Sequence, residues 1–437
     1  MTSKLILPSR DDLVRHVLYS LASYWPTACY ELSRLKVRDN QKECRLQIPL
    51  SLVSIKLPEW AKDCGVNGAI LVPQESVSGS LKISTWRETD WWLAMFLMME
   101  CWHERIWERN YGEIHSYSFK LKGWDTRAWD YAWVNRIGLF LRKWFLLENN
   151  LKDDFFGKLP QPKLSVSHDV DAVSKTLPIR IKQGAFNLFN AILLVKKGKF
   201  FASLRTLAKA RRVLFGFDDW WLFEKLLKLE EEFEVRAVYN FYADQRPKNL
   251  KRWLMDPSYE VTSARIKALL HEIKKAGHDI GLHPSFDSWN NSKLLKDQKL
   301  HLENSLGSEV SSCRQHWLRF GWRTTWKAQS VAGLKKDSTL MFNDRFGFRN
   351  SSAISWHPWD ESSSNAQSVQ CTSSVIMDSH FYDYQKMNVA QRSKEINCLT
   401  DECKHVGGEA FVLWHPHTLS DDYGWTEGFR TLLQSIK

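Results

Sequence analysis

From residue 163 to the end of the chain, segments with the pattern of β-strands alternate with segments with the pattern of α-helices. We expect strands at 163–168, 235–242, 278–283, 311–317, 338–342, 373–377 and 409–414. We expect helices between several of them, at 219–233, 260–276, 290–305, 385–406 and 425–436. Such alternation predicts an α/β fold with a mostly parallel sheet or barrel, whose functional groups gather at the carboxyl ends of the strands.

The 437 residues exceed one ordinary compact core, which predicts two parts. The first, 1–155, has a mixed α/β pattern: helices from about residue 11 and at 90–109 and 129–147, and strands at 46–55, 69–73 and 81–84. It contains no catalytic constellation. The stretch 153–162, with two prolines, marks a boundary, and 160–437 is the expected barrel. The 22 tryptophans of the chain suit a core, and also a protein that stacks sugar rings.

The first strand of the barrel ends in two aspartates, Asp169 and Asp171. Side chains two residues apart in a strand share a face, which places these carboxylates roughly 7 Å apart along the chain. Two like charges this close are costly unless a cation or an arginine neutralises them. A divalent metal shared with distant histidines is one interpretation. The alternative is a pair that caps a helix or forms a turn.

Polar residues recur where later strands end. They are His283, Ser285 and Asp287 after the third strand, Arg314 and His316 in the fourth, Arg349 and Asp378 further on, and His415 and His417 after the last. A single histidine at the end of a strand is more often structural than a ligand. Recurrence at several strand ends favours one shared site.

Five motifs resemble the polysaccharide deacetylase superfamily, which has the NodB-homology fold and includes carbohydrate esterase family 4. They are Ser-His-Asp-Val-Asp at 167–171, Gly-Leu-His-Pro-Ser at 281–285, Arg-Gln-His-Trp-Leu-Arg at 314–319, Gly-Phe-Arg at 347–349 and Leu-Trp-His-Pro at 413–416. The resemblance covers about 163–437 and is greatest to a divergent D-x-D subgroup. It implies a NodB-type distorted (β/α) barrel, here with a mixed α/β N-terminal domain and a basic helical insertion.

The resemblance also implies a metal site. Asp171 matches the metal-binding aspartate, and His283 matches the first histidine of the family's H-x-x-x-H motif. The second histidine is replaced by Asp287. Either Asp287 or His316 could complete the site, and we favour His316 because an imidazole keeps the usual ligand set. The implied cofactor is a divalent metal, zinc before other ions.

The remaining roles follow from the same resemblance. Asp169 matches the general base, and Arg314 matches the arginine that pairs with it. Arg349 competes for that role or binds substrate. His415 matches the histidine that protonates the leaving group, with His417 as its alternate. We assign Ser285, Asp287 and His417, together with Arg349, to substrate binding.

These roles describe a hydrolase that removes an N-acyl group, such as acetyl, from a sugar of a surface polysaccharide or its precursor. The missing histidine supports a second hypothesis, a catalytically inactive NodB-like protein that binds glycans or an assembly partner. A third is another C–N hydrolase on the same fold, such as a cyclic-imide hydrolase.

The net charge of +11 comes almost entirely from one segment, 175–217. It holds ten of the 61 basic residues and no acidic one, so the rest of the chain carries 51 basic and 50 acidic side chains. With its apolar residues, it is typical of a basic amphipathic helix pair on an anionic membrane surface, where a sugar substrate could be lipid-linked. A solvated basic face is an equal alternative, and no nucleic-acid-binding motif is present.

The eight cysteines are scattered without a C-x-x-C pair, which predicts reduced thiols. The first residues form no secretory leader, and no stretch has the ~20 apolar residues of a membrane span. We therefore expect a cytoplasmic protein, peripheral on the inner membrane if the basic segment binds lipid.

Overall fold

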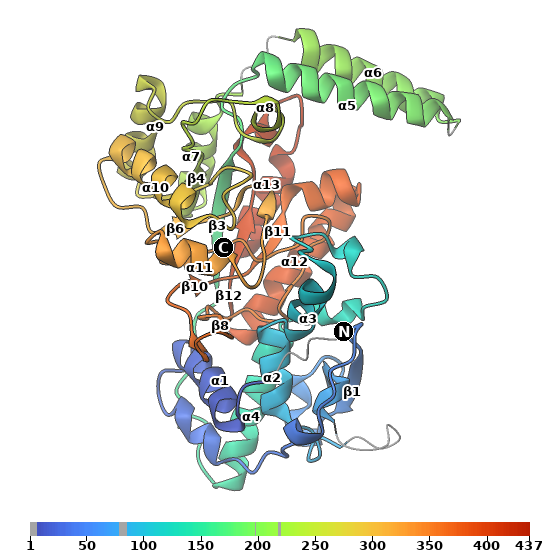
Figure 1. The fold of residues 1–437 in the computed structure, drawn as a ribbon. Coiled ribbons are helices and arrows are strands. Elements are labelled where there is room, and N and C mark those ends of the chain that lie inside the picture. The colour runs from blue at the N-terminus through green and yellow to red at the C-terminus, as the bar shows by residue number, and fades with distance from the viewer. Residues whose placement is uncertain (1–6, 78–84, 197, 217–219) are drawn as a thin grey trace.

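The computed structural model describes residues 7–77, 85–196, 198–216 and 220–437. The strand expected at 81–84 lies outside these ranges. Eight strands form one sheet in the order β10-β7-β6-β5-β4-β3-β12-β11, and every neighbouring pair runs parallel (Figure 1). The strands are β3 (Lys163–Val170), β4 (Ala237–Phe241), β5 (Asp279–Leu282), β6 (Ser312–Cys313), β7 (Lys336–Asp337), β10 (Gln370–Cys371), β11 (Ser374–Met377) and β12 (Glu409–Leu413).

The two edge strands, β10 and β11, are parts of one continuous segment, 370–377. Backbone amides of Gln370, Thr372 and Ser374 donate to carbonyls of 335–340 at 2.9–3.0 Å. On its other side, the amide of Phe411 in β12 donates to the carbonyl of Ser373 at 2.9 Å. The segment therefore bridges the two edges and closes the sheet. This strand topology confirms the prediction of a distorted (β/α) barrel of the NodB type.

Helices lie between the strands of the barrel. They are α7 (Phe223–Glu232), α8 (Leu250–Met255), α9 (Ala264–Lys275), α10 (Ser292–Leu306), α11 (Thr325–Val331), α12 (Val389–Val406) and α13 (Thr426–Ile436). Both ends of helix α12 are well defined. Asn388 and Gln391 form a capping box at its start, and Gly407, with φ 63°, ends it. The strand expected at 311–317 is only two residues long, and one reason is that the chain turns at Trp317 and Leu318, both at positive φ. The strand expected at 338–342 is wrong in position, because β7 lies before this range and 338–342 has no regular strand.

The N-terminal part contains α1 (Arg10–Tyr24), β1 (Leu52–Lys56), β2 (Ala69–Pro73), α2 (Trp91–Met99), α3 (Trp102–Tyr111) and α4 (Trp133–Glu148). Strands β1 and β2 are antiparallel, as are the short β8 (Trp359–Asp360) and β9 (Asn365–Ala366). The single helix expected at 90–109 is two helices, because Cys101 between them has φ 43°. Every residue of α2 is buried.

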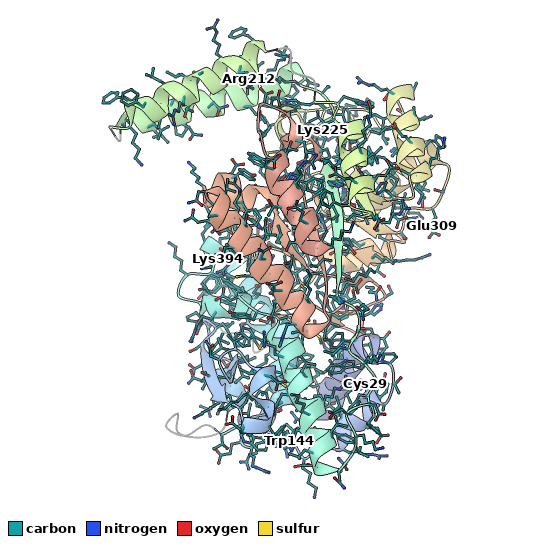
Figure 2. All side chains as sticks on the ribbon, turned by 180° about the vertical axis from the view of Figure 1, so that it is seen from behind. Cys29, Trp144, Arg212, Lys225, Glu309 and Lys394 are labelled. Carbon is teal, nitrogen blue, oxygen red and sulfur yellow. The ribbon has the colours of Figure 1, made fainter. Side chains whose placement is uncertain are left out.

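The hydrophobic core of the N-terminal part continues across the predicted boundary at 155–160. It includes Phe320, Trp322, Trp326, Trp356 and Trp359 of the C-terminal part. Trp144 of α4 belongs to the same core, at the far end of the molecule from the hairpin described next (Figure 2). Many of the tryptophans therefore serve packing between the two parts.

The basic segment 175–217 forms a hairpin of two helices, α5 (Leu177–Lys196) and α6 (Phe200–Phe215), as predicted. Figures 1 and 2 show that this hairpin extends away from the barrel, with Arg212 toward its base. Within the described ranges, no helix combines the length and the apolar character needed to cross a bilayer.

Candidate functional site

Three side chains from the carboxyl ends of three strands of the barrel sheet converge at one point. Asp171 follows β3, His283 follows β5 and His316 follows β6. The Oδ1 atom of Asp171 lies 3.2 Å from Nε2 of His283 and 3.4 Å from Nε2 of His316. One ligand atom from each residue lies within 4.8 Å of the other two, close enough to hold one metal ion. The structure thus brings together the three residues predicted as metal ligands.

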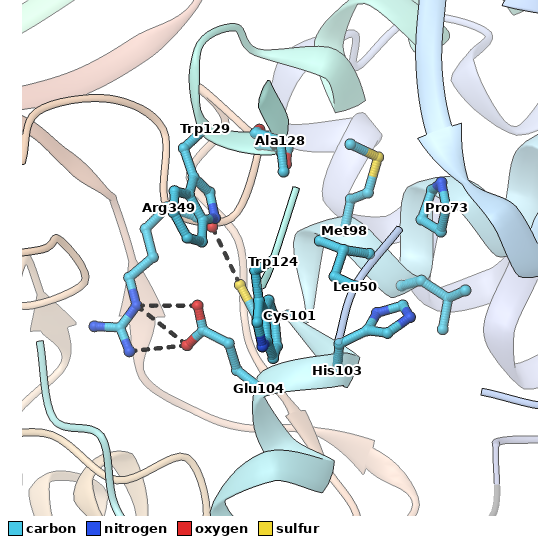
Figure 3. Close-up of a pocket in the computed structure, with 12 residues that line it drawn as sticks. Leu50, Pro73, Met98, Cys101, His103, Glu104, Trp124, Ala128, Trp129 and Arg349 are labelled. Atoms are coloured by element: carbon cyan, nitrogen blue, oxygen red, sulfur yellow. Dashed lines mark hydrogen bonds and ion pairs between the residues drawn. The ribbon is translucent and has the colours of Figure 1, made fainter. Parts of the chain in front are cut away.

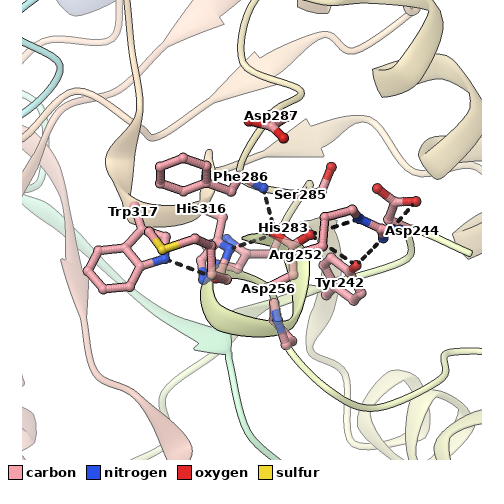
Figure 4. Close-up of polar contacts among 12 residues, drawn as sticks. Tyr242, Asp244, Arg252, Asp256, His283, Ser285, Phe286, Asp287, His316 and Trp317 are labelled. Atoms are coloured by element: carbon pink, nitrogen blue, oxygen red, sulfur yellow. Dashed lines mark hydrogen bonds and ion pairs between the residues drawn. The ribbon is translucent and has the colours of Figure 1, made fainter. Parts of the chain in front are cut away.

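Polar groups lie behind both histidines, on the side of the ring that faces away from Asp171. Nδ1 of His283 lies 2.8 Å from the carbonyl oxygen of Arg314, which fixes the proton on Nδ1 and leaves the Nε2 lone pair free. Nδ1 of His316 faces Oδ1 of Asp256 at 3.8 Å (Figure 4). Asp256 is held in turn by Arg252 and by the backbone amide of Phe286. This is the carboxylate–histidine arrangement that supports metal ligands.

The donor set fits a zinc-like ion. Oδ1 of Asp171 is buried and has no hydrogen-bond partner among the described residues. Burial alone would raise the pKa of Asp171, but His283, whose Nε2 lies 3.2 Å from Oδ1, and the charge of His316 hold that pKa well below its usual range. Two imidazoles and one carboxylate are a known set of three protein ligands, which leaves a fourth position for water or substrate.

Asp169 lies beside this cluster, in β3, and is almost fully buried. Its Oδ1 accepts a hydrogen bond from the Asn240 amide at 2.9 Å and lies 3.4 Å from Nη1 of Arg314. Arg314 is fully buried and also donates to Ser167 and Ser374 at 2.6 and 3.0 Å. These contacts end on Oδ1, so Oδ2 keeps lone pairs on the side of His283, whose Nδ1 is 3.9 Å away.

His415 follows β12 and reaches the cluster from the opposite side. Its Nε2 lies 3.5 Å from Oδ2 of Asp171, and its Nδ1 lies 2.9 Å from Oδ1 of Asp378. The second oxygen of Asp378 accepts the backbone amide of His415 and the hydroxyl of Thr418. Burial lowers the pKa of His415, but Asp378 and, more weakly, Asp171 and Asp169 raise it to about 10. The ring therefore carries a proton.

His417 sits one step behind His415. Its ring centroid is 5.7 Å from that of His415, and it stacks on Trp220 at 5.4 Å. Burial and the charge of His415 lower the pKa of His417 to about 4, although the charges of Asp171 and Asp378 oppose them. It is a neutral neighbour of the site.

Arg349 does not join the cluster. Its guanidinium pairs with Glu104 of α3, with Nη2 at 2.8 Å from Oε2 (Figure 3). It also donates to the carbonyl of Met341 at 3.0 Å. The cavity beside it, lined by Leu50 and Trp124 among others, has about 20 Å³, room for a single water. The predicted role of Arg349 in substrate binding is therefore replaced by a contact between the two parts of the chain.

Ser285 and Asp287 lie just beyond His283 but do not point at the cluster. The Ser285 hydroxyl accepts from Gln298 at 2.8 Å, and Asp287 pairs with Lys251 at 2.6 Å, apart from the histidines in Figure 4. Asp287 therefore does not complete the predicted metal site, whereas His316 is placed to do so. Beyond Ser285, a hollow of about 360 Å³ lies between Arg246 and Gln298.

Three polar residues of the site had no predicted role. They are Asp378 behind His415, Asp256 behind His316, and Asn240 beside Asp169. Asp378 stands at a strand end, and that position was its only signal. Asp256 follows the short helix α8, where the sequence offers no such signal.

Comparisons with known proteins found similar solved structures but no similar sequence family or curated protein. No family model and no curated protein matches the chain. A candidate polysaccharide deacetylase from Mycobacterium smegmatis is 16% identical, with a TM-score of 0.37 over 64% of this chain and 86% of its own. A mutant, with restored enzymatic activity, of a CE4-family pseudoenzyme from Bacillus anthracis is 12% identical, with a TM-score of 0.29 over 64% of each chain. The PuuE allantoinase is 12% identical, with a TM-score of 0.33 over 53% of this chain and 69% of its own. Polysaccharide deacetylases and CE4 proteins belong to the superfamily that the sequence motifs resemble.

Proposed function

We propose that this chain is a metal-dependent hydrolase that cleaves the C–N amide bond of an N-acylated sugar, with acetyl as the simplest acyl group. One observation carries the proposal: Asp171, His283 and His316 converge between a buried carboxylate, Asp169, and a histidine, His415, whose Nδ1 lies 2.9 Å from Asp378. Metal-assisted amide hydrolysis needs these groups: ligands for a cation, a proton acceptor and a proton donor.

The cation belongs at Asp171, His283 and His316, and we propose zinc. When bound there, a divalent cation lowers the pKa of water and polarises the amide carbonyl. Asp169 accepts the proton of the attacking water on Oδ2, because the contacts of Arg314 and Asn240 fall on Oδ1. The positive charge of Arg314 orients the Asp169 carboxylate and balances its negative charge inside the barrel.

His415 acts on the other side of the scissile bond. Nδ1 donates to Asp378, so the remaining proton sits on Nε2, which faces Asp171. From there it passes to the departing amine, which would otherwise leave as a strongly basic anion. Afterwards Asp378 holds the neutral ring in place for the next proton.

The substrate is proposed to be a carbohydrate of a surface polysaccharide or its lipid-linked precursor. The hollow between Arg246 and Gln298 has a volume in the range of small-ligand sites, and we propose that it holds neighbouring sugar units. We place the protein in the cytoplasm, which the eight free cysteines support. The inactive glycan-binding protein remains the competing hypothesis, and the two differ in metal content and turnover.

The first experiment is elemental mass spectrometry of the purified chain beside Asp171→Ala and His283→Ala. The proposal expects about one zinc-like ion per chain, lost in both variants. Asp279→Asn is the matched control, because Asp279 stands at the opposite end of β5 and pairs with Lys274. Wild-type protein that stays metal-free after reconstitution would favour the glycan-binding scaffold.

The second experiment is acyl release from N-acetylglucosamine oligomers by the zinc-loaded protein. Asp169→Asn and His415→Ala should each lose about 10²–10⁴ in turnover while the thermal unfolding midpoint is retained. Asp279→Asn should turn over like the wild type. Full activity in both site variants would contradict the proposal.

A further inference from the structure

The hairpin of α5 and α6 is packed through its small residues. Gly184, Ala191, Ser203 and Ala210 are buried, and the Ser203 hydroxyl donates to the carbonyl of Ala191 at 2.9 Å. A methyl group added at Gly184 would lie 2.5 Å from Leu214. The two helices therefore approach closely and leave little room for large side chains between them.

Large apolar side chains of the hairpin point outward instead. In its distal half, six of them are between 45% and 83% exposed: Phe189, Ile192, Val195, Phe200, Phe201 and Leu204. Soluble proteins rarely expose so many apolar groups in one contiguous place without a partner. In this hairpin, small residues lie between the helices and large apolar residues face outward. A helix pair that faces water has the reverse arrangement, whereas helices that pack in contact with lipid have this one.

The charge of the hairpin identifies which apolar partner fits. Segment 175–217 has ten basic residues and no acidic one, and the rest of the chain is nearly neutral. Lys196, Lys199 and Arg205 are exposed beside the outward-facing Phe200 and Phe201. A second copy of the chain would bring an equally positive hairpin, whereas an anionic lipid surface offers both opposite charge and an apolar interior.

We propose that the distal half of this hairpin docks on an anionic lipid bilayer surface. Phe200 and Phe201 enter the boundary between headgroups and acyl chains, and Lys196, Lys199 and Arg205 contact the headgroups. The hairpin lies on the surface rather than across it, in keeping with the absence of a bilayer-length apolar helix from the described ranges. This surface does not depend on the proposed hydrolase activity.

The base of the hairpin is tied to the loop that carries His415 and His417. Lys175 and Arg212 pair with Asp422, which also accepts the indole N–H of Trp220 at 2.9 Å. Trp220 in turn stacks on His417. Because the hairpin leaves the barrel directly after Asp171, docking would hold the candidate site at the membrane surface.

The test is co-sedimentation of the full chain with vesicles of phosphatidylglycerol and phosphatidylcholine, and with vesicles of phosphatidylcholine alone. We expect binding to the anionic vesicles that is released by high salt. Phe200→Ser/Phe201→Ser and Lys196→Gln/Lys199→Gln/Arg205→Gln should each weaken it by about 100-fold. The matched controls are Phe119→Ser, which is 61% exposed, and Lys293→Gln/Lys296→Gln/Lys394→Gln, all exposed on α10 and α12.

Circular dichroism and the unfolding midpoint show that each variant is folded. No binding to anionic vesicles, or binding that neither hairpin variant weakens, would overturn the proposal. Dimerisation in ultracentrifugation that Phe200→Ser/Phe201→Ser abolishes, without vesicle binding, would also overturn it and assign the face to a second copy. Acyl release is not measured, so the result stands whether or not the chain is a hydrolase.

Discussion

Charged groups are buried in two regions of this molecule, and the two regions treat them differently. At the junction of the two parts of the chain, Glu104 pairs with Arg349 and Glu100 pairs with Arg105 and His16. At the carboxyl end of the barrel, several polar atoms point at one place, and Oδ1 of Asp171 lacks a hydrogen-bond partner among the described residues. These junction charges are paired with one another, whereas the charged groups at the barrel end face one shared point.

This difference distinguishes charged residues that stabilise the fold from charged residues that bind a ligand or react. A buried ion pair that is complete within the chain fixes how two surfaces meet, and it fails when one partner is removed. A set of buried donors that face one another across a gap instead costs stability unless a ligand binds. We therefore expect substitutions at the barrel end to affect binding and turnover, and substitutions at the junction to affect folding.

The largest effect is expected for Asp378→Asn. The oxygen that faces the His415 amide and Thr418 must stay an acceptor, so the new NH₂ group would face Nδ1 of His415. That ring would become neutral and a much weaker acid. Acyl release should fall at least ~100-fold with an unchanged unfolding midpoint, and Asp421→Asn, an exposed aspartate of the nearby loop, should behave as wild type. Wild-type turnover in Asp378→Asn would show that His415 needs no carboxylate.

The next effect is on stability. Arg349→Met leaves Glu104 charged and buried, and should lower the free energy of unfolding by about 3–5 kcal/mol in urea titrations. Glu104→Gln/Arg349→Met removes both charges and should recover much of the loss. Arg15→Met, at a surface arginine, should change stability by less than ~0.5 kcal/mol. A similarly small change for Arg349→Met would remove the distinction between the two regions.

Asp256→Asn is expected to have a smaller effect, on metal affinity. The carboxylate behind His316 supports the ring from 3.8 Å, and loss of such support costs about 10–100-fold in affinity. Zinc titration against a competing chelator measures it, with Asp279→Asn as the control at the other end of β5. Unchanged affinity would mean that His316 is oriented without Asp256.

The last effect concerns pH and Glu108, a junction carboxyl that forms no ion pair among the described residues. Burial raises the pKa of Glu108 from 4.5 to about 8, and its Oε2 accepts a hydrogen bond from the Trp322 amide at 3.0 Å. The folded state therefore binds one proton more than the unfolded state between these values, and stability falls as pH rises through this window. Glu108→Gln keeps the acceptor and loses the titration, so its unfolding midpoint should fall less over that pH range.

The alternation of strands and helices followed from the local sequence pattern, whereas the candidate ligands Asp171, His283 and His316 followed from the resemblance of their motifs to a known family. Arg349 could not be placed in this way, because its partner Glu104 is 245 residues away and no regular strand fixes the face of 343–350. Asp256 escaped for a related reason, since it reaches His316 from a loop after α8. The closure of the barrel by 370–377 was equally hidden, because it depends on carbonyls of Lys335, Asp337 and Leu340, in and beside a strand, β7, that is only two residues long.

The two ends of the hairpin leave and rejoin the barrel at almost the same point. Arg180, near the start of α5, donates to the carbonyls of Leu214 and Gly216 at the end of α6, at 3.0 and 2.8 Å. An arm joined at a single point can lengthen, shorten or change its surface while the register of every barrel strand stays as it is. The proposed membrane docking of the hairpin and the proposed hydrolysis in the barrel are thus separable traits, free to evolve at different rates.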